Sequence, residues 1–221
     1  MKQLKYISII GILILNSCSN SEGYTIEKKF KSLVNNQNCQ IEYYYPKFIS
    51  KDSSNKEVEL NNILEDYADY EYYVHRCDEQ RDDRRIVKGD FNITLKTEDK
   101  LSIEFITEIF FFAGNQIDTV YHSIVLNPKK IEDKEFSLFQ TDPKLLIPNF
   151  NRANLSKYIE EYNSNHSDKV NLLAYKSESN YVITWGISEN DFLLYVGGEG
   201  EWFGNDKIRI PINELKKGNN R

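Results

Sequence analysis

FNITLKTEDKLSIEFITEIFFFAGNQIDTVYHSIVL, residues 91–126, is the stretch that decides the fold. Apolar and polar residues alternate through Phe91–Leu95, through Leu101–Phe111 and again through Ile117–Leu126. Alternation with a period of two is typical of β-strands that bury one face. Because short polar connections join the three runs, neighbouring strands must be antiparallel. The stretch therefore predicts a three-stranded meander, and we expect a helix to cover its odd-numbered face.

Strand and helix patterns also flank the meander. Gln40–Phe48 alternates until Pro46, where we expect the strand to end. Apolar residues at three- and four-residue spacing predict one helix over 57–77 and a second over 151–163. Further strands are predicted over three runs near the C-terminus: Tyr181–Trp185, Phe192–Val196 and Lys207–Ile212. Few helices and many local strands predict an α+β fold of two small lobes of antiparallel sheet, each covered by a helix.

The first eighteen residues resemble a bacterial lipoprotein signal. Lys2 and Lys5 precede a nine-residue apolar run, which is too short to cross a bilayer of about 30 Å. Leu15-Asn16-Ser17-Cys18 then has a lipobox-like form. The resemblance implies cleavage before Cys18 and lipidation of that cysteine. A plain secretory signal, or a buried strand with an accidental cysteine, is the alternative.

These patterns divide the chain into five segments. The expected boundaries are a signal peptide (1–17), a lipid-anchored tether (18–32), a first lobe (33–126), a second lobe (127–217) and a polar tail (218–221). Ser19 after the lipidated cysteine lacks acidic character, which favours the outer membrane within the cell envelope.

The charge balance limits the possible partners. The chain carries 28 basic and 34 acidic residues, and its formal net charge is −6. Cleavage of residues 1–17 would remove two lysines and no acidic residue, which leaves a net charge of −8. An acidic chain is poorly suited to neutralise phosphates, so we expect no nucleic-acid partner. The membrane link should be the lipid alone, and we expect a monomer without cofactor or metal.

Cys39 and Cys77 remain as a pair once Cys18 is lipidated. An exported protein meets an oxidising compartment, so a disulfide between them is expected, worth about 4 kcal/mol in the chain-entropy model. Two free buried thiols are the main alternative. A metal site with His75 and Asp78 is a further alternative, although it lacks a second close pair of ligands.

The search for catalytic motifs finds no nucleophile elbow, zinc-protease helix or phosphate-binding loop. Glu199, Glu201, Trp202 and Phe203 form the candidate binding surface, because the two aromatic residues lie on a glycine-rich connection. These aromatic residues could instead fold back onto the core. The same two glutamates could serve acid–base chemistry, although a solvated loop is the simpler explanation.

The order of elements resembles the PdaC/RsiV-like domains, exported bacterial domains of unknown activity. They precede the catalytic part of some peptidoglycan deacetylases and form the extracellular part of a lysozyme-sensing anti-sigma factor. The matching stretches are Ile41–Pro46, Leu60–Ile63, Leu101–Phe105, Phe136–Phe139 and Ile208–Leu215. Ala113-Gly114-Asn115-Gln116 departs from the Gly-Gly-x-His of that family, so no role is carried over for its histidine. The resemblance implies no catalytic residue.

Two classes of function follow. The first is a non-catalytic, lipid-anchored envelope module that binds a lysozyme-like protein or peptidoglycan. The second is an envelope glycan hydrolase that uses acidic residues. A structural role is a third alternative.

Overall fold

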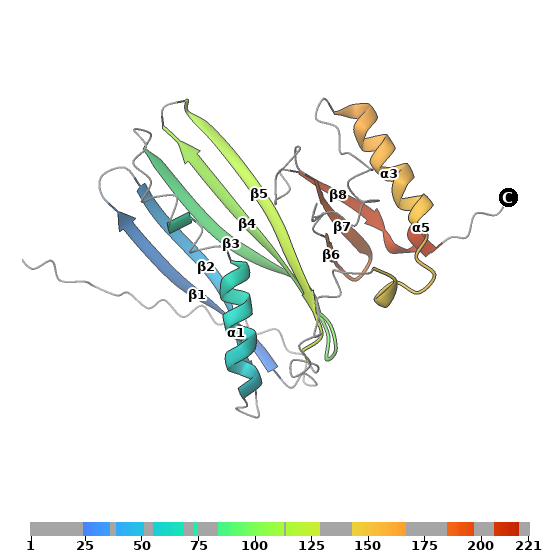
Figure 1. Cartoon of the computed structure of the whole chain (residues 1–221), viewed down its shortest axis with the longest axis horizontal. Coiled ribbons are helices and arrows are strands. Elements are labelled where there is room, and N and C mark those ends of the chain that lie inside the picture. Colours follow the sequence, from blue (N-terminus) through green and yellow to red (C-terminus); the bar gives the residue numbers. More distant parts are fainter. Residues whose placement is uncertain are drawn as a thin grey trace, which may run out of the picture.

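A computed structural model of the chain describes nine segments. They are residues 24–35, 39–50, 55–68, 73–74, 84–112, 114–128, 143–166, 185–196 and 206–216. These segments form a five-stranded sheet, a three-stranded sheet and helices on their outer faces (Figure 1). The α+β class and the two sheet-and-helix lobes are confirmed. None of the helices in these segments is both long and apolar enough to span a bilayer.

The five strands of the first sheet follow chain order, β1-β2-β3-β4-β5. Their bounds are β1 Tyr24–Asn35, β2 Cys39–Ser50, β3 Arg85–Lys96, β4 Leu101–Phe111 and β5 Gln116–Leu126. β3, β4 and β5 pair antiparallel, which confirms the predicted meander. The pairing of β2 with β3 is parallel over Cys39–Tyr43, so the sheet is mixed rather than purely antiparallel.

Helix α1 (Asn55–Tyr67) lies on one face of this sheet and connects the two parallel strands. Leu60 and Leu64 are fully buried in the same core as Ile103 and Phe105, so the odd-numbered face of β4 carries the helix, as predicted. The Asn61 amide fixes the helix to β2: its Oδ1 accepts from the Phe48 N–H at 2.7 Å and its Nδ2 donates to the Phe48 carbonyl at 2.9 Å.

Gly89 on β3 leaves room for the ring of Tyr43, which lies on the neighbouring strand β2. A Cβ at residue 89 would lie 2.1 Å from that ring, a distance that real contacts do not reach. The ring instead passes over the glycine, and the Tyr43 and Thr107 hydroxyls are 2.9 Å apart. A glycine is needed here because of this close approach, and an aromatic ring covers the gap that it leaves.

The second sheet has three antiparallel strands, β6 (Trp185–Ile187), β7 (Asp191–Val196) and β8 (Asp206–Pro211). Helix α3 (Arg152–Asn165) buries Leu155 and Ile159 against one face, together with Trp185 and Phe192. The short helix α5 (Ile212–Lys216) and the 3-10 turn η2 (Pro143–Leu145) complete this lobe. The helix predicted over 151–163 is therefore confirmed.

The other face of the second sheet contacts the first sheet. Gly186 packs against Ser102 and Ser123, and Tyr195 and Lys207 point to Glu104. Because α1 lies on the opposite side of the first sheet, the layers run α1, first sheet, second sheet, α3. In Figure 1 the sheets come together where β5 ends and diverge towards the β4–β5 turn.

The structure corrects three predictions. Residues 24–32, expected in the tether, belong to β1, whose charged residues hide the alternation and are typical of an edge strand. The strand expected to end at Pro46 continues to Ser50 as β2. β2 leaves β3 after Tyr43, and a proline is tolerated where one side of a strand is unpaired. Helix α1 ends at Tyr67 rather than near residue 77.

Candidate functional site

Most of the residues predicted to be functional lie outside the described segments. These are the lipidation site Cys18, the disulfide partner Cys77 and the candidate binding surface, Glu199, Glu201, Trp202 and Phe203. Cys39 is described at the start of β2, where it is buried in the first core. The disulfide and the lipid anchor each involve a residue outside these segments, so both stay predictions.

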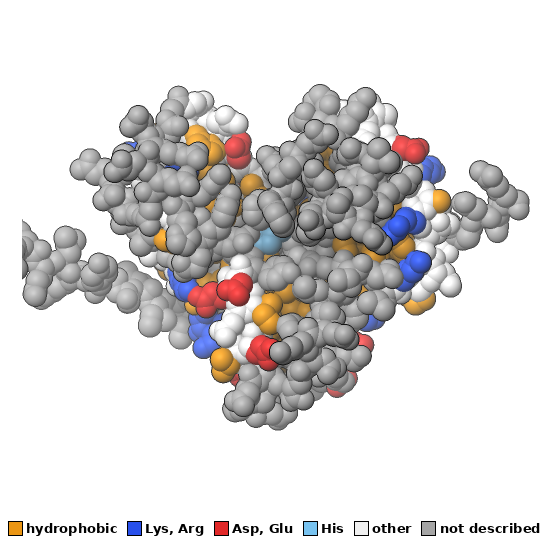
Figure 2. All heavy atoms as spheres, viewed as in Figure 1, with side chains coloured by type: hydrophobic (Ala, Val, Ile, Leu, Met, Phe, Trp, Pro, Cys, Tyr) orange, Lys and Arg blue, Asp and Glu red, His pale blue; other side chains and the backbone are white. Residues whose placement is uncertain are grey.

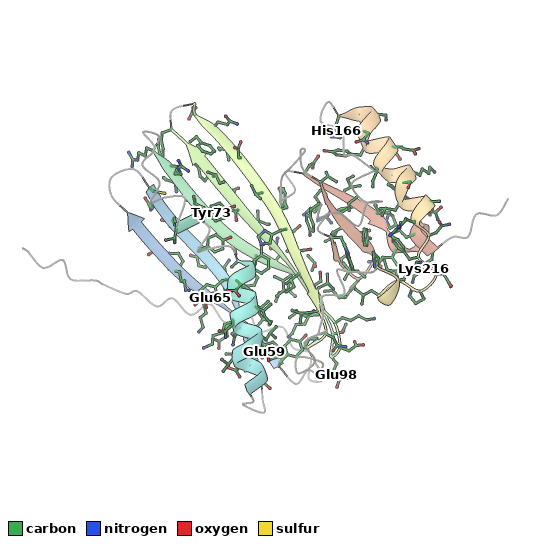
Figure 3. All side chains as sticks on the ribbon, in the orientation of Figure 1. Glu59, Glu65, Tyr73, Glu98, His166 and Lys216 are labelled. Atoms are coloured by element: carbon green, nitrogen blue, oxygen red, sulfur yellow. The ribbon has the colours of Figure 1, made fainter. Side chains whose placement is uncertain are left out.

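The structure does describe β7 and β8, the strands before and after the candidate binding surface in the chain. Val196 pairs with Asp206, so residues 197–205 connect two adjacent antiparallel strands. The Tyr162 hydroxyl at the end of α3 donates to Asp206 Oδ2 at 2.9 Å. Its ring stacks on His166, the C-cap of that helix, which is labelled in Figure 3. The end of α3 thus fixes the point at which this connection returns to the sheet.

A buried polar cluster lies where the two sheets meet. Glu104 on β4 is only 3% exposed. Its Oε1 accepts from the Tyr195 hydroxyl at 3.0 Å and from the Lys207 ammonium at 2.6 Å. Asn92 Nδ2 donates to Oε2 at 3.2 Å. Both carboxylate oxygens are therefore engaged, as a buried charge requires.

Two tyrosines border this carboxylate. Burial, followed by the charge of Glu104, raises the pKa of Tyr195 well above its ordinary value. Burial and the nearby carboxylates of Glu104, Asp206 and Glu108 also raise the pKa of Tyr121. The Lys207 ammonium lies 5.3 Å from the centroid of the Tyr121 ring. Both phenols stay protonated at neutral pH, and Tyr195 acts as a hydrogen-bond donor to Glu104.

Small hydroxyl side chains complete the contact between the sheets. Ser102 Oγ accepts from the Ile187 N–H at 3.1 Å, and Thr94 Oγ1 donates to the Ile187 carbonyl at 2.8 Å. Ser123 Oγ donates to the Trp185 carbonyl at 2.6 Å. These bonds satisfy backbone groups of β6 that face the first sheet, so the hydroxyl side chains help to join the two sheets.

A second group of polar and aromatic side chains is exposed. We define the β1–β3 patch as Lys28, Phe30, Tyr44 and Asp90. Phe30 is 51% exposed and Tyr44 is 40% exposed, and their ring centroids lie 4.9 Å apart across β1 and β2. The Lys28 ammonium lies 4.3 Å from the centroid of the Tyr44 ring and 2.7 Å from Asp90 Oδ2. Exposed aromatic side chains beside charged groups are typical of binding surfaces.

Charges of both signs also adjoin each other around α1. Lys31 on β1 forms an ion pair with Glu65 of the helix, and Figure 2 shows acidic and basic side chains side by side in this part of the molecule.

Within the described segments, no group of three or more histidine, cysteine, aspartate or glutamate side chains could hold a metal ion.

Sequence reasoning missed both polar groups. Glu104 stands on the even-numbered, polar side of an alternating strand and looks solvated until the second sheet covers it. The β1–β3 patch depends on β1, most of which lies in the segment that the sequence predicts as the tether. The cross-strand pair Phe30 and Tyr44 could have been found only with the register of β1 against β2 known.

Two of the solved structures to which this chain is similar are DUF3298 family proteins. A DUF3298 family protein from Pseudomonas aeruginosa PAO1 has a TM-score of 0.48 and 9% identity, over 89% of this chain and 93% of that chain. A member of the DUF3298 family from Bacteroides fragilis NCTC 9343 has a TM-score of 0.46 and 7% identity, over 89% of this chain and 92% of that chain. No protein-family model and no curated protein matches the sequence.

Proposed function

We propose that this protein is a non-catalytic binding module that a lipid on Cys18 anchors in the cell envelope. The observation that carries the proposal is the start of the chain, where a basic flank, a short apolar run and Leu15-Asn16-Ser17-Cys18 follow each other as in a lipoprotein signal. Strand β1 begins at Tyr24, only six residues after Cys18, so the fold would be held close to the bilayer. Ser19 favours the outer membrane.

The partner that we propose is a lysozyme-like protein or peptidoglycan, in line with the resemblance to PdaC/RsiV-like domains. An acidic chain attracts basic proteins, and such binding should weaken with added salt. The buried carboxylate Glu104 supports a non-catalytic role for the contact between the lobes, because Tyr195, Lys207 and Asn92 occupy both of its oxygens.

Fractionation tests the anchor. We expect the wild-type protein to fractionate with membranes and to incorporate a labelled fatty acid, while Cys18→Ala should be unlabelled and released or left unprocessed. Cys39→Ser serves as the matched control, because it removes a different cysteine and should retain the label. A wild-type protein that stays unlabelled would refute the lipid assignment.

Binding assays test the module. Full-length protein in detergent should retain lysozyme or purified peptidoglycan, and a Trp202→Ala/Phe203→Ala variant should retain less. Val58→Ala is the control, because Val58 is a 63% exposed apolar residue on α1, outside the candidate surface. Retention of neither ligand, together with peptidoglycan turnover that is lost in Glu199→Gln or Glu201→Gln, would replace the binding module with a hydrolase.

A further inference from the structure

The β1–β3 patch binds one of the protein's own cations between an aromatic ring and a carboxylate. The Lys28 ammonium lies 2.6 Å from Asp90 Oδ1 and 2.7 Å from Oδ2. The same nitrogen lies 4.3 Å from the centroid of the Tyr44 ring and 5.8 Å from that of Phe91. A cation over a ring face with a carboxylate beside it satisfies both requirements of a cation site.

The parts of this site that face Lys28 are held by other contacts. The Phe91 N–H donates to Asp90 Oδ1 at 2.7 Å, so the backbone of β3 orients the carboxylate. Phe30 packs against the Tyr44 ring from the neighbouring strand. The ring and the carboxylate would therefore keep their positions if Lys28 moved away.

Lys28 itself is weakly held. Its side chain is 42% exposed and that of Asp90 is 50% exposed, so water and salt screen the ion pair. A lysine side chain is flexible and its ammonium is strongly hydrated, so the cation can leave the site at small cost. An arginine suits the site better, because its planar guanidinium can stack on a tyrosine and bind a carboxylate through two parallel hydrogen bonds.

We infer that the β1–β3 patch is a docking site for an arginine side chain of a basic partner protein, and that Lys28 occupies this site in the free chain. The charge of the molecule fits such a partner: the chain carries a net charge of −6, and displacement of Lys28 frees the carboxylate of Asp90. The inference rests on the proposed function, because it names the chemistry that the module recognises.

Displacement of Lys28 can be measured directly by lysine acetylation and mass spectrometry on the full-length protein in detergent. N-acetyl-arginine amide, which has no reactive amine, should raise the acetylation rate of Lys28. Lys29 is the internal control, because its side chain is 40% exposed and pairs with Glu27 at 2.6 Å. A second control uses N-acetyl-citrulline amide, a neutral analogue, with sodium chloride added to the same ionic strength. It shows how much of the effect is screening of the ion pair by salt.

Variants separate the site from general charge effects. In Asp90→Asn or Tyr44→Ala, Lys28 should react about two- to fivefold faster from the start, as expected for a weak exposed ion pair, and should no longer respond to the arginine compound. An unchanged Lys28 rate at saturating arginine compound would overturn the inference, as would an equal rise for Lys29 or with the citrulline control. None of these results would change the outcome of the fractionation and retention assays, which test the proposed function separately.

Discussion

The ammonium group of Lys207 on β8 lies 2.6 Å from a carboxylate oxygen of Glu104 on β4, and this ion pair joins the two sheets. Glu104 is almost completely buried, and the Lys207 side chain is 19% exposed. A charge in such a position depends on its partner far more than a surface charge does.

Removal of Lys207 should destabilise the protein strongly. Lys207→Ala leaves the Glu104 carboxylate buried without its cation, a change that typically costs about 3–5 kcal/mol of the free energy of unfolding. Lys29→Ala is the matched control, because the exposed pair of Lys29 and Glu27 should contribute less than about 1 kcal/mol. Urea denaturation of both variants measures the difference. Equal losses in the two variants would contradict a stabilising role for the buried pair.

Gly89→Ala should also be destabilising, for a steric reason. The new Cβ would meet the Tyr43 ring at 2.1 Å, so the ring must move and its contact with Thr107 is lost. Overpacking of this kind costs about 1–3 kcal/mol of the free energy of unfolding. Gly114→Ala is the control, because the nearest atom to its Cβ would be 3.8 Å away.

A double-mutant cycle identifies the cause of that loss. In a Tyr43→Ala background, Gly89→Ala should cost much less than in the wild-type protein, because the clashing ring is gone. If Gly89→Ala were equally costly in both backgrounds, the Tyr43 ring would not be the reason for a glycine on β3.

The stability of the protein should fall at alkaline pH. Burial and Glu104 raise the pKa of Tyr195 above its ordinary value of 10.0, so the unfolded chain loses this proton first. Above pH 10 the unfolded state then binds fewer protons than the folded state, and the free energy of unfolding decreases by up to about 1.4 kcal/mol per pH unit. Denaturation curves between pH 9 and about pH 11 check this slope. Tyr195→Phe should flatten it; an unchanged slope would assign the effect to other groups.

The predicted disulfide has a direct chemical test. Protein purified from the cell envelope should give a Cys39–Cys77 linked peptide in non-reducing mass spectrometry. Reduction should lower the free energy of unfolding by about 2–4 kcal/mol, because the unfolded chain regains freedom in the loop between the two cysteines. A Cys39→Ser/Cys77→Ser variant should be insensitive to reductant. Recovery of two free thiols from the wild-type protein would reject the bridge.

Local patterns predicted those parts of the fold that local contacts form. The meander of β3, β4 and β5 depends on alternation and short connections, and α3 depends on its apolar spacing and its N-cap Asn151. The parallel pairing of β2 with β3 depends on a crossover connection that contains α1. No local sequence pattern is specific to such a crossover.

The polar clusters were unpredictable for a related reason. Ser102 and Glu104 have the polar side chains expected on an exposed sheet face, and only the docking of a distant segment buries them. The sequence pattern does not predict strand β1, because Glu27, Lys28 and Lys29 interrupt its alternation of apolar and polar residues. Charged residues are common on edge strands. The contact that buries Glu104 joins residues far apart in the chain, whereas β1 pairs with β2, its neighbour in sequence.

The parallel pairing of β2 with β3 divides the folding of the first sheet into two kinds of event. β1 with β2, and β3 with β4 and β5, are neighbours in sequence and can form hairpins within about 1–10 μs. Their union must wait for closure of the crossover between residues 50 and 85, which is a slower, non-local step. Until then, the facing edges of β2 and β3 remain open to strands of other chains. A newly synthesised molecule would therefore be most prone to aggregation in the interval before these two edges meet.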